Sequence, residues 1–317
     1  MMAVVDTRSA ARELRDRFGD SVAVDAPLAP LTAYRVGGPA DALVTPETVG
    51  ELQAVVRHCL DSEVPMFVLG SGANILVADE GVRAIVLVLS RCCDQMDWDG
   101  ELLYVGAGRT VWDLVTFCER EGLEGLDFMS GIPGTVGGAL TMNAGAFVGE
   151  IGDRVARVAA LDERGDRIDI DHVDAGFAYR RAPGLSGKIL LGCWLTMRPG
   201  DSAALATARE EYLARRAEKQ PLEYPSCGSV FKRPPGDYAG RLIEAVGGKG
   251  MRIGGAMVSP KHANFIVNTG GACARDIYEL IATVQDKVAT ETGVRLETEV
   301  KLIGFSDAER RRVEGER

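Results

Sequence analysis

The sequence lacks the cysteine patterns of a disulfide framework and of a zinc site. Its seven cysteines are scattered and odd in number, and none forms a Cys-X-X-Cys motif. The three histidines, His58, His172 and His262, also lack the spacing of metal ligands. Small secreted domains and zinc proteins depend on such patterns. We therefore expect no metal site and a protein that works in the reducing cytoplasm.

Long hydrophobic runs are also missing. No stretch of about 18 apolar residues occurs, so we expect no membrane-spanning helix. The segment 1–19 carries charges throughout and lacks the apolar core of a secretory signal. The net charge of −10 argues against nucleic acid or an anionic membrane as the main partner. A local basic pocket for a phosphorylated ligand remains compatible with that charge.

Three familiar catalytic or nucleotide-binding motifs are incomplete. In the segment 70–75, GSGANI, Ile75 stands where the dinucleotide fingerprint GxGxxG requires its last glycine. No GK[ST] follows, so the segment is not a P-loop. Ser229 follows Gly228 but is not followed at the required spacing by a second glycine, which excludes the GxSxG elbow of hydrolases.

Two glycine-rich segments are the most unusual features that the sequence does contain. Residues 130–146, SGIPGTVGGALTMNAGA, hold five glycines and no charge, and show neither helical nor strand periodicity. The segment 70–74 follows a buried strand, and its backbone N–H groups could form a nest for a pyrophosphate. The longer segment alone is equally compatible with a plain packing loop, and the shorter one alone is more often a plain turn after a strand. Together they could hold the two halves of a dinucleotide.

The remaining pattern predicts a mixed α and β protein of two or three domains. No internal repeat or low-complexity segment occurs. We expect helices at 9–18, 110–121, 202–219, 238–246 and 274–290. A further helix is expected to start at Thr45-Pro46. We expect strands at 65–69, 84–89, 102–105, 189–196 and 294–303, with further strands between 155 and 197.

Three polar positions are candidates for chemistry, each with an ordinary structural alternative. Arg180 ends a predicted β segment, where it is either a solvated edge charge or a clamp for a carboxylate or phosphate. Ser229 is otherwise a turn serine that bonds its own backbone. In the segment 294–303 the apolar residues alternate with charged ones, and Glu299 is either solvated or turned into a cleft as an acid.

Seven segments, taken in order, resemble one known family. They read TAYRVGGPA at 32–40, GSGANILV at 70–77, GIPGTVGGALTMNAGA at 131–146, FAYR at 177–180, GSVFKRP at 228–234, KHANF at 261–265 and LETEV at 296–300. In this order and spacing the chain, over roughly 25–305, is similar to the UDP-N-acetylenolpyruvoylglucosamine reductase family. The short stretch 182–188 cannot hold a tyrosine-bearing insertion, so the resemblance is to the shorter form.

The resemblance implies an α+β fold with an FAD-binding region of the vanillyl-alcohol-oxidase (PCMH) type. That region would comprise two subdomains, 1–86 and 87–203, followed by a substrate-binding domain at 204–317. It also implies a cytoplasmic enzyme of peptidoglycan precursor synthesis, which we expect to be a monomer or a weak dimer.

The resemblance further implies the reaction and its catalytic residues. NADPH would reduce FAD, and a hydride would then pass to C3 of UDP-N-acetylglucosamine enolpyruvate. The resulting enolate would be stabilised by Arg180 and Glu299 and protonated at C2 by Ser229. Such a division places fixed charge where charge develops and a proton source beside the carbanion.

Binding residues follow from the same resemblance. The expected FAD-binding residues are Arg35, Gly70, Ser71, Gly72, Ala73, Asn74, Ile75, Ser130, Gly131, Ile132, Pro133, Gly137, Gly138, Asn143 and Arg216. The expected substrate-binding residues are Tyr179, Lys219, Lys232 and His262. Two positions depart from the family pattern: Ala73 stands where a serine is common, and Arg181-Ala182-Pro183 replaces a serine-bearing continuation.

Two other functions are compatible with the sequence. One is a PCMH-type flavin oxidoreductase that acts on a different substrate. The other is a non-catalytic protein that binds a flavin or a UDP-sugar. The joint presence of Arg180, Ser229 and Glu299 favours the reductase over both.

Overall fold

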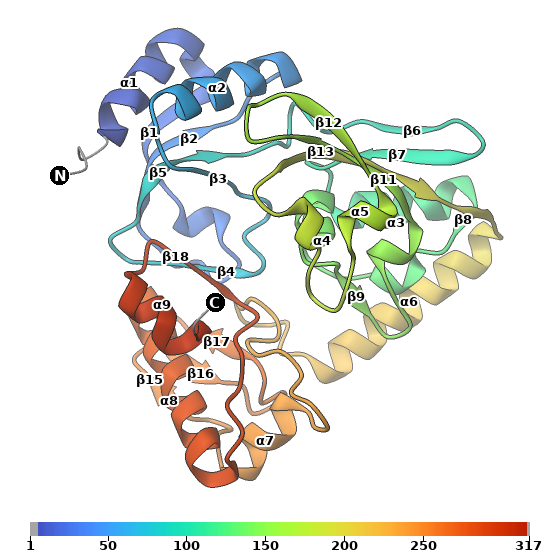
Figure 1. Ribbon diagram of the computed structural model, residues 1–317. Helices are drawn as coiled ribbons and strands as arrows, with labels where there is room; N and C mark the ends of the chain where they lie inside the picture. Colours follow the sequence, from blue (N-terminus) through green and yellow to red (C-terminus); the bar gives the residue numbers. More distant parts are fainter. Residues whose placement is uncertain (1–5, 316–317) are drawn as a thin grey trace. The chain divides into compact units, whose positions relative to one another are not determined.

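The structure is a computed structural model that describes residues 6–315 (Figure 1). Its contacts divide the chain into two compact units. The first contains the described residues up to Asp25, then Asp41–Ser71 and Ala84–Arg215. The second contains Ala26–Ala40, Gly72–Arg83 and the described residues from Arg216 onward. Two short N-terminal segments therefore belong with the C-terminal part of the chain. The division into three domains stays a prediction.

The first sheet carries the N-terminal helices. Its four strands run in the order β1-β2-β5-β3, and β3 lies parallel to β5. Helices α1 and α2 cover one face of it and bury apolar residues such as Leu14 and Leu52 (Figure 1). The bounds are β1 Val22–Pro27, β2 Pro39–Val44, β3 Met66–Val68, β5 Val82–Leu87, α1 Thr7–Phe18 and α2 Val49–Asp61.

The second sheet of the first unit has five antiparallel strands in the order β12-β11-β13-β7-β6. Its strands are β6 Met96–Trp98, β7 Leu102–Gly106, β11 Val155–Leu161, β12 Arg167–Asp171 and β13 Ile189–Thr196. The helices beside it are α3 Val111–Glu121, α4 Val136–Thr141 and α5 His172–Ala175. Two small ribbons pair β8 Leu123–Glu124 with β14 Arg198–Pro199, and β9 Gly145–Ala146 with β10 Gly149–Glu150.

The second unit is built around helix α8, Ala274–Thr292, which buries Ile277, Ile281 and Val284. Tyr34 and Leu76, from the two N-terminal segments, belong to the same apolar core. Strand β4 pairs in parallel with β18, and β15, β16 and β17 form an antiparallel sheet. The bounds are β4 Ile75–Val77, β15 Arg252–Ile253, β16 Ala256–Val258, β17 Ile266–Asn268, β18 Lys301–Ile303, α7 Ala239–Ala245 and α9 Asp307–Glu314.

Helix α6, Ser202–Lys219, has the predicted bounds, and its last four residues are grouped with the second unit. Within residues 6–315, no helix combines the length and apolar character needed to cross a membrane. Single-turn 3₁₀ helices occupy Gly19–Ser21, Ala29–Leu31, Asp127–Met129, Ile151–Arg154 and Pro183–Leu185.

Two of the predicted element boundaries are wrong for identifiable reasons. Helix α2 begins at Val49, because Thr48 rather than Thr45 caps it by accepting the Glu51 amide at 3.1 Å. Only Lys301–Ile303 of the predicted last strand pairs as a ladder. The segment before it still alternates in burial as predicted, although it forms an isolated bridge, Thr298 with Phe231, and no ladder.

Candidate active site

The structure brings the two glycine-rich segments together within the first unit. A Cβ atom on Gly70 would lie 2.6 Å from the Thr135 hydroxyl oxygen, so only glycine allows this approach. A Cβ atom on Gly134 would lie 4.0 Å from the Ser71 hydroxyl oxygen. The two segments singled out in the sequence therefore lie beside each other, and their joint binding of a dinucleotide stays a prediction.

The longer segment contains a helix that its sequence does not reveal. Thr135 caps α4 by accepting the Gly138 amide at 3.3 Å, and the Gly137 amide donates to Ala107 O at 2.9 Å. The sequence shows no helical periodicity here, because a six-residue helix is too short to show a period. The two adjacent glycines differ: a Cβ on Gly137 would meet Ala107 at 3.1 Å, whereas Gly138 is exposed.

The shorter segment has the geometry of an anion nest. Among the described residues, the amides of Gly70, Ser71, Gly72 and Ala73 find no acceptor. Gly72 has φ +61°, and its Cβ would fall 2.2 Å from Leu31 O, so this turn also requires glycine. Successive N–H groups around a left-handed glycine bind anions. These residues therefore fit the diphosphate of a dinucleotide such as FAD.

In the second unit, side chains fix the continuation of this nest. The Cys227 thiol donates to Ile75 O at 3.3 Å, and burial raises the pKa of that thiol to about 12. The Asn74 side-chain Nδ2 donates to Glu299 O at 3.1 Å, and the Lys301 backbone amide donates to Asn74 O at 3.0 Å. The end of the nest is thus bonded directly to the backbone of Glu299.

Ser229 and Glu299 lie in neighbouring backbone segments of the same unit. The Glu299 amide donates to Val230 O at 2.7 Å, one residue after the serine. Buried Asn264 holds this loop, because its side chain bonds both Phe231 N, at 3.0 Å, and Phe231 O, at 2.9 Å. The structure therefore brings together Ser229, Glu299 and the Gly72–Ile75 segment.

Sequence reasoning assigned no role to Asn264 or Cys227. Asn264 stands in the KHANF segment, yet its amide acts on a loop 33 residues away in the chain. A thiol that donates to a backbone carbonyl 152 residues away likewise leaves no local pattern. Both contacts are visible only in three dimensions.

Arg180 stands at the third position of a tight turn in the first unit. Ala178 and Arg181 exchange backbone hydrogen bonds of 2.9 and 3.0 Å, which leaves Tyr179 and Arg180 at the tip. Arg180 has φ +56°, a conformation that glycine usually supplies at such a position. Its guanidinium lies 5.1 Å from the centre of the Tyr179 ring, and Nη2 donates to Gly145 O at 3.3 Å.

Positive φ angles mark several of the predicted site residues. Among the described non-glycine residues, six have φ in the left-handed region, and three of these are Arg35, Asn143 and Arg180. Such conformations cost of order 1–3 kcal/mol and gather where function requires the side chain. The sequence gives no sign of this, because none of the three residues is a glycine.

Four predicted FAD-binding residues of the first unit lie at different depths. Ile132 is partly exposed and Pro133 exposed. Ser130 and Asn143 are instead buried, at 0% and 2% exposure. The Ser130 hydroxyl donates to Asp127 O at 2.6 Å, and the Asn143 side chain bonds three protein groups. For these two residues the geometry favours support of the loops.

The predicted basic residues of the second unit have varied surroundings. Arg35 is exposed at the end of the turn that begins at Thr32. Burial lowers the pKa of the Arg216 guanidinium. Lys219 is exposed at the end of α6, and Lys232 forms an ion pair with Glu297.

His262 is held as an acceptor in the second unit. Its Nδ1 accepts the Asn264 amide at 3.3 Å, and its ring meets Phe265 edge-on. Burial, reinforced by Lys249, lowers the pKa of the imidazole, while its own backbone acts in the opposite direction. The neutral imidazole is therefore the form that the folded protein favours.

This pKa shift predicts a loss of stability in acid. The unfolded chain takes up a proton at His262 near pH 6.5, whereas the folded protein resists it, so stability should fall as pH drops below that value. We expect His262→Gln to reduce the fall in melting temperature between about pH 7.5 and about pH 5. An equal fall in both proteins, measured by thermal denaturation, would contradict this reading.

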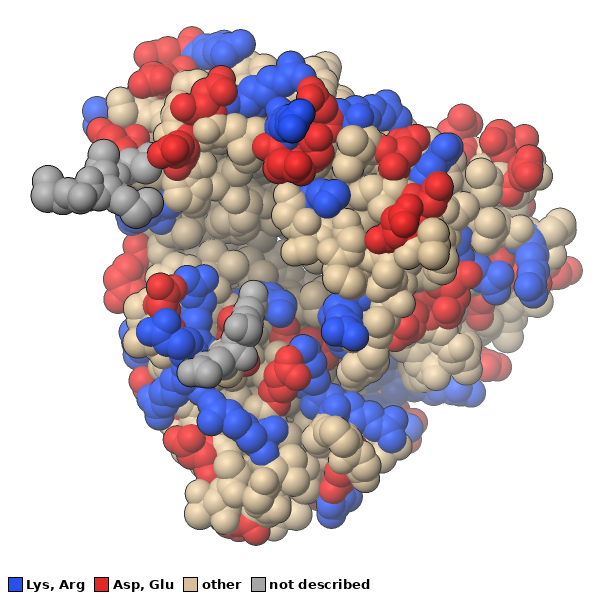
Figure 2. Space-filling view, in the orientation of Figure 1, with Lys and Arg blue, Asp and Glu red and all other residues tan. Residues whose placement is uncertain are grey.

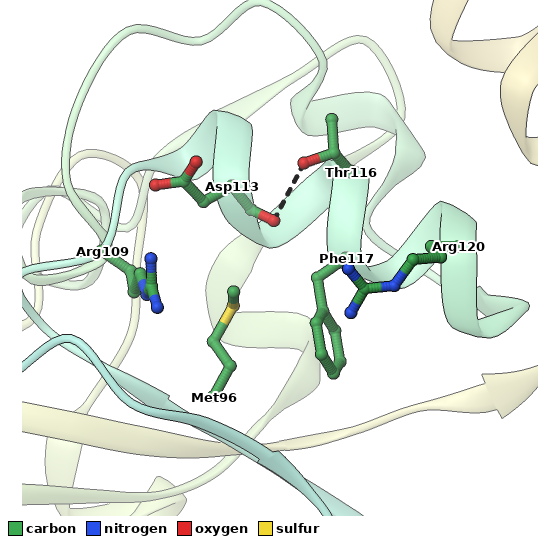
Figure 3. Close-up of a pocket in the computed structure, with 6 residues that line it drawn as sticks. All are labelled: Met96, Arg109, Asp113, Thr116, Phe117 and Arg120. Atoms are coloured by element: carbon green, nitrogen blue, oxygen red, sulfur yellow. Dashed lines mark hydrogen bonds between the residues drawn. The ribbon is translucent and has the colours of Figure 1, made fainter.

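One surface pocket has a lining that includes none of the predicted residues. It has a volume of about 530 Å³ and is lined by Met96, Arg109, Asp113, Thr116, Phe117 and Arg120. The lining comes from β6, from α3 and from the segment that leads into α3, with Arg109 and Phe117 on opposite sides of Met96 (Figure 3). None of the catalytic or binding residues predicted from the sequence lies in this pocket.

Two family models match successive parts of the chain. Residues 40–171 match the family described as "FAD binding domain". Residues 220–303 match "UDP-N-acetylenolpyruvoylglucosamine reductase, C-terminal domain". A curated reductase of that name from Anaeromyxobacter sp. (strain Fw109-5) is 46% identical over 297 residues, covering 94% of this chain and 93% of the relative. The chain belongs to the UDP-N-acetylenolpyruvoylglucosamine reductase family.

Other members of this reductase family agree in length and fold. The reductase from Moorella thermoacetica is 42% identical and covers 95% of this chain and 99% of its own. The crystal structure of UDP-N-acetylenolpyruvylglucosamine reductase from Thermus caldophilus matches with a TM-score of 0.76 at 37% identity. It covers 89% of this chain and 98% of its own. The predicted α+β fold, an FAD-binding region followed by the family's C-terminal domain, is confirmed; the narrower PCMH assignment stays a prediction.

Proposed function

We propose that this chain catalyses the NADPH-dependent reduction of UDP-N-acetylglucosamine enolpyruvate to UDP-N-acetylmuramate, with FAD as its cofactor. The observation that carries the proposal lies in the second unit, where Ser229 and Glu299 adjoin the Gly72–Ile75 segment. The nest continues into Asn74, which bonds to the backbone of Glu299, and Glu299 in turn bonds to the loop that carries Ser229, so a cofactor diphosphate would lie near the candidate acid and the candidate carboxylate. Membership of the family adds independent support.

The glycine-rich segments are suited to hold FAD. The four amides of residues 70–73 would bind its diphosphate, and Arg35 and Arg216 would add positive charge. Segment 131–134 and exposed Gly138 would present backbone to the flat ring, since a glycine allows close approach. When bound, FAD supplies a carrier for two electrons between NADPH and the enolpyruvate.

Three side chains are proposed to act on the enolpyruvyl group. Hydride addition at C3 leaves negative charge on the carboxyl end of the substrate, which Arg180 would stabilise together with Glu299. Ser229 would deliver the proton that C2 must gain, so that one hydride and one proton complete the saturated product. Within the described residues the Ser229 hydroxyl has no partner, which leaves it available to a substrate.

Basic residues are proposed to bind the substrate's diphosphate and sugar. Lys219, Lys232 and His262 lie in the second unit and Tyr179 in the first. On the face shown in Figure 2, acidic and basic side chains are interspersed, so the net charge of −10 does not prevent local anion binding. We propose a cytoplasmic monomer or weak dimer; seven free cysteines, six of them buried, support a reducing compartment.

The proposal predicts a yellow protein with substrate-dependent NADPH oxidation. Purified protein should release FAD on denaturation and consume NADPH only slowly until UDP-N-acetylglucosamine enolpyruvate is added. The product should then be UDP-N-acetylmuramate by mass spectrometry. A protein that binds no FAD on titration would contradict the cofactor and the function. A yellow protein that does not reduce this substrate would point to a different flavin oxidoreductase.

A further inference from the structure

A buried carboxamide joins the turn that carries Arg180 to the rest of the first unit. Asn143 Nδ2 donates to Ala178 O at 3.2 Å and to Glu150 Oε2 at 2.7 Å. Its Oδ1 accepts the Gly152 amide at 2.9 Å. Reversing the amide would turn its oxygen toward two acceptors and its nitrogen toward a donor. The network therefore permits one orientation.

Arg180 makes a second connection between its own turn and the segment that follows Asn143. Its guanidinium donates to Gly145 O at 3.3 Å, two residues after Asn143. The β9–β10 hairpin and the Ala178–Arg181 turn are thus joined at both the base and the tip. A Cβ atom on Gly145 would lie 2.3 Å from Gly149 O, so the hairpin that accepts Arg180 has little freedom to change.

Backbone strain concentrates in the same place. Asn143 has φ +42°, and Phe147 and Arg180 have φ +58° and +56°. Asparagine tolerates the left-handed region better than most residues, but glycine would be the relaxed choice at all three positions. Position 143 nevertheless carries asparagine, and its carboxamide has three hydrogen-bond partners.

We propose that Asn143 is a positioning residue for the guanidinium of Arg180. Its carboxamide fixes Ala178, the residue that begins the turn, and its bond to Glu150 ties that turn to the hairpin on which Arg180 rests. The inference rests on the proposed function, because it assigns Arg180 to the substrate's carboxyl end. The sequence predicts that Asn143 contacts FAD. We instead assign to Asn143 an effect that acts through the side chain of Arg180.

Two variants separate positioning from folding. Asn143→Gly keeps the left-handed backbone but removes all three side-chain bonds. Asn143→Asp combined with Glu150→Gln keeps the shape and restores a donor and an acceptor between these two positions. It removes the side-chain donor to Ala178 O, which then accepts only the Arg181 amide. Glu63→Gly is the matched control, because Glu63 is an exposed residue with φ +52° elsewhere in the first unit.

The test measures the two half-reactions by anaerobic stopped flow. Both Asn143 variants should bind FAD and be reduced by NADPH like the wild type, while reoxidation by the enolpyruvate slows about 10–100-fold. In an Arg180→Lys background the same changes should slow reoxidation less than about threefold, because the residue they position is already replaced. Glu63→Gly should match the wild type in both steps.

Three outcomes would overturn the inference. One is reoxidation at the wild-type rate in both Asn143 variants. Another is equal slowing with Arg180 present and replaced, which would indicate a general structural effect. The third is loss of FAD with no change in reoxidation of the remaining loaded enzyme. A wild-type protein that the enolpyruvate does not reoxidise would instead overturn the proposed function, and this inference with it.

Discussion

Ser229→Ala should leave reduction by NADPH intact and slow reoxidation by UDP-N-acetylglucosamine enolpyruvate by about 10²–10⁴-fold. A positioned general acid contributes a factor of that size. The change removes one hydroxyl from a loop whose backbone is held by Val230 N on Asn264 O and by the Asn264 side chain. The loop should therefore keep its shape. Rapid-mixing absorbance in the flavin band measures both steps.

The control for this variant is Ser226→Ala. Ser226 is a partly buried serine three residues earlier in the same loop, and no catalytic role is proposed for it. Its removal should alter neither half-reaction by more than about twofold. Normal reoxidation in Ser229→Ala would show that Ser229 is not the proton donor. Slowing of both half-reactions would show that the loop itself had moved.

Gly138→Leu should abolish FAD binding while the first unit stays folded. Gly138 is exposed in α4, and the nearest described neighbour of a Cβ atom at this position would be the Thr135 hydroxyl oxygen, at 3.5 Å. Leucine should stabilise the helix by up to about 1 kcal/mol relative to glycine. Its side chain would fill the space that we assign to the flavin, so FAD affinity should fall at least about 100-fold. Fluorescence titration and thermal denaturation measure the two effects.

Gly137→Leu provides the contrast. A Cβ at this position would already contact Ala107 at 3.1 Å, so the larger side chain should cost about 1–3 kcal/mol of folding stability. The two neighbouring substitutions thus have opposite expected effects on the protein without cofactor. Full FAD occupancy in Gly138→Leu would contradict the assignment of α4 to the cofactor site.

The sequence predicts most of the local structure because the relevant signals are local. Helix α3 begins after its Thr110 cap and ends at left-handed Gly122, and α6 and β13 have the predicted bounds. Thr45 was predicted as the cap of α2 in place of Thr48, because both threonines are followed by acceptable first-turn residues. Helix α9 was missed, although Ser306 and Glu309 form a capping box.

The arrangement of the site is less accessible from sequence. Motif order identified the family and the candidate residues, but not the assignment of segments 26–40 and 72–83 to the second unit. The left-handed backbone of Arg180 and the buried carboxamides of Asn143 and Asn264 are also spatial facts. Each depends on partners that are 7–35 residues away from the side chain along the chain. Local patterns cannot report such partners.

The most direct test of the proposed function is a two-step anaerobic titration of the purified protein. One equivalent of NADPH should bleach the flavin band, and UDP-N-acetylglucosamine enolpyruvate should then restore it with formation of one equivalent of UDP-N-acetylmuramate. Restoration of the band by this substrate in the absence of oxygen is the expected result. A flavin that NADPH bleaches and that stays bleached after addition of the enolpyruvate would contradict it.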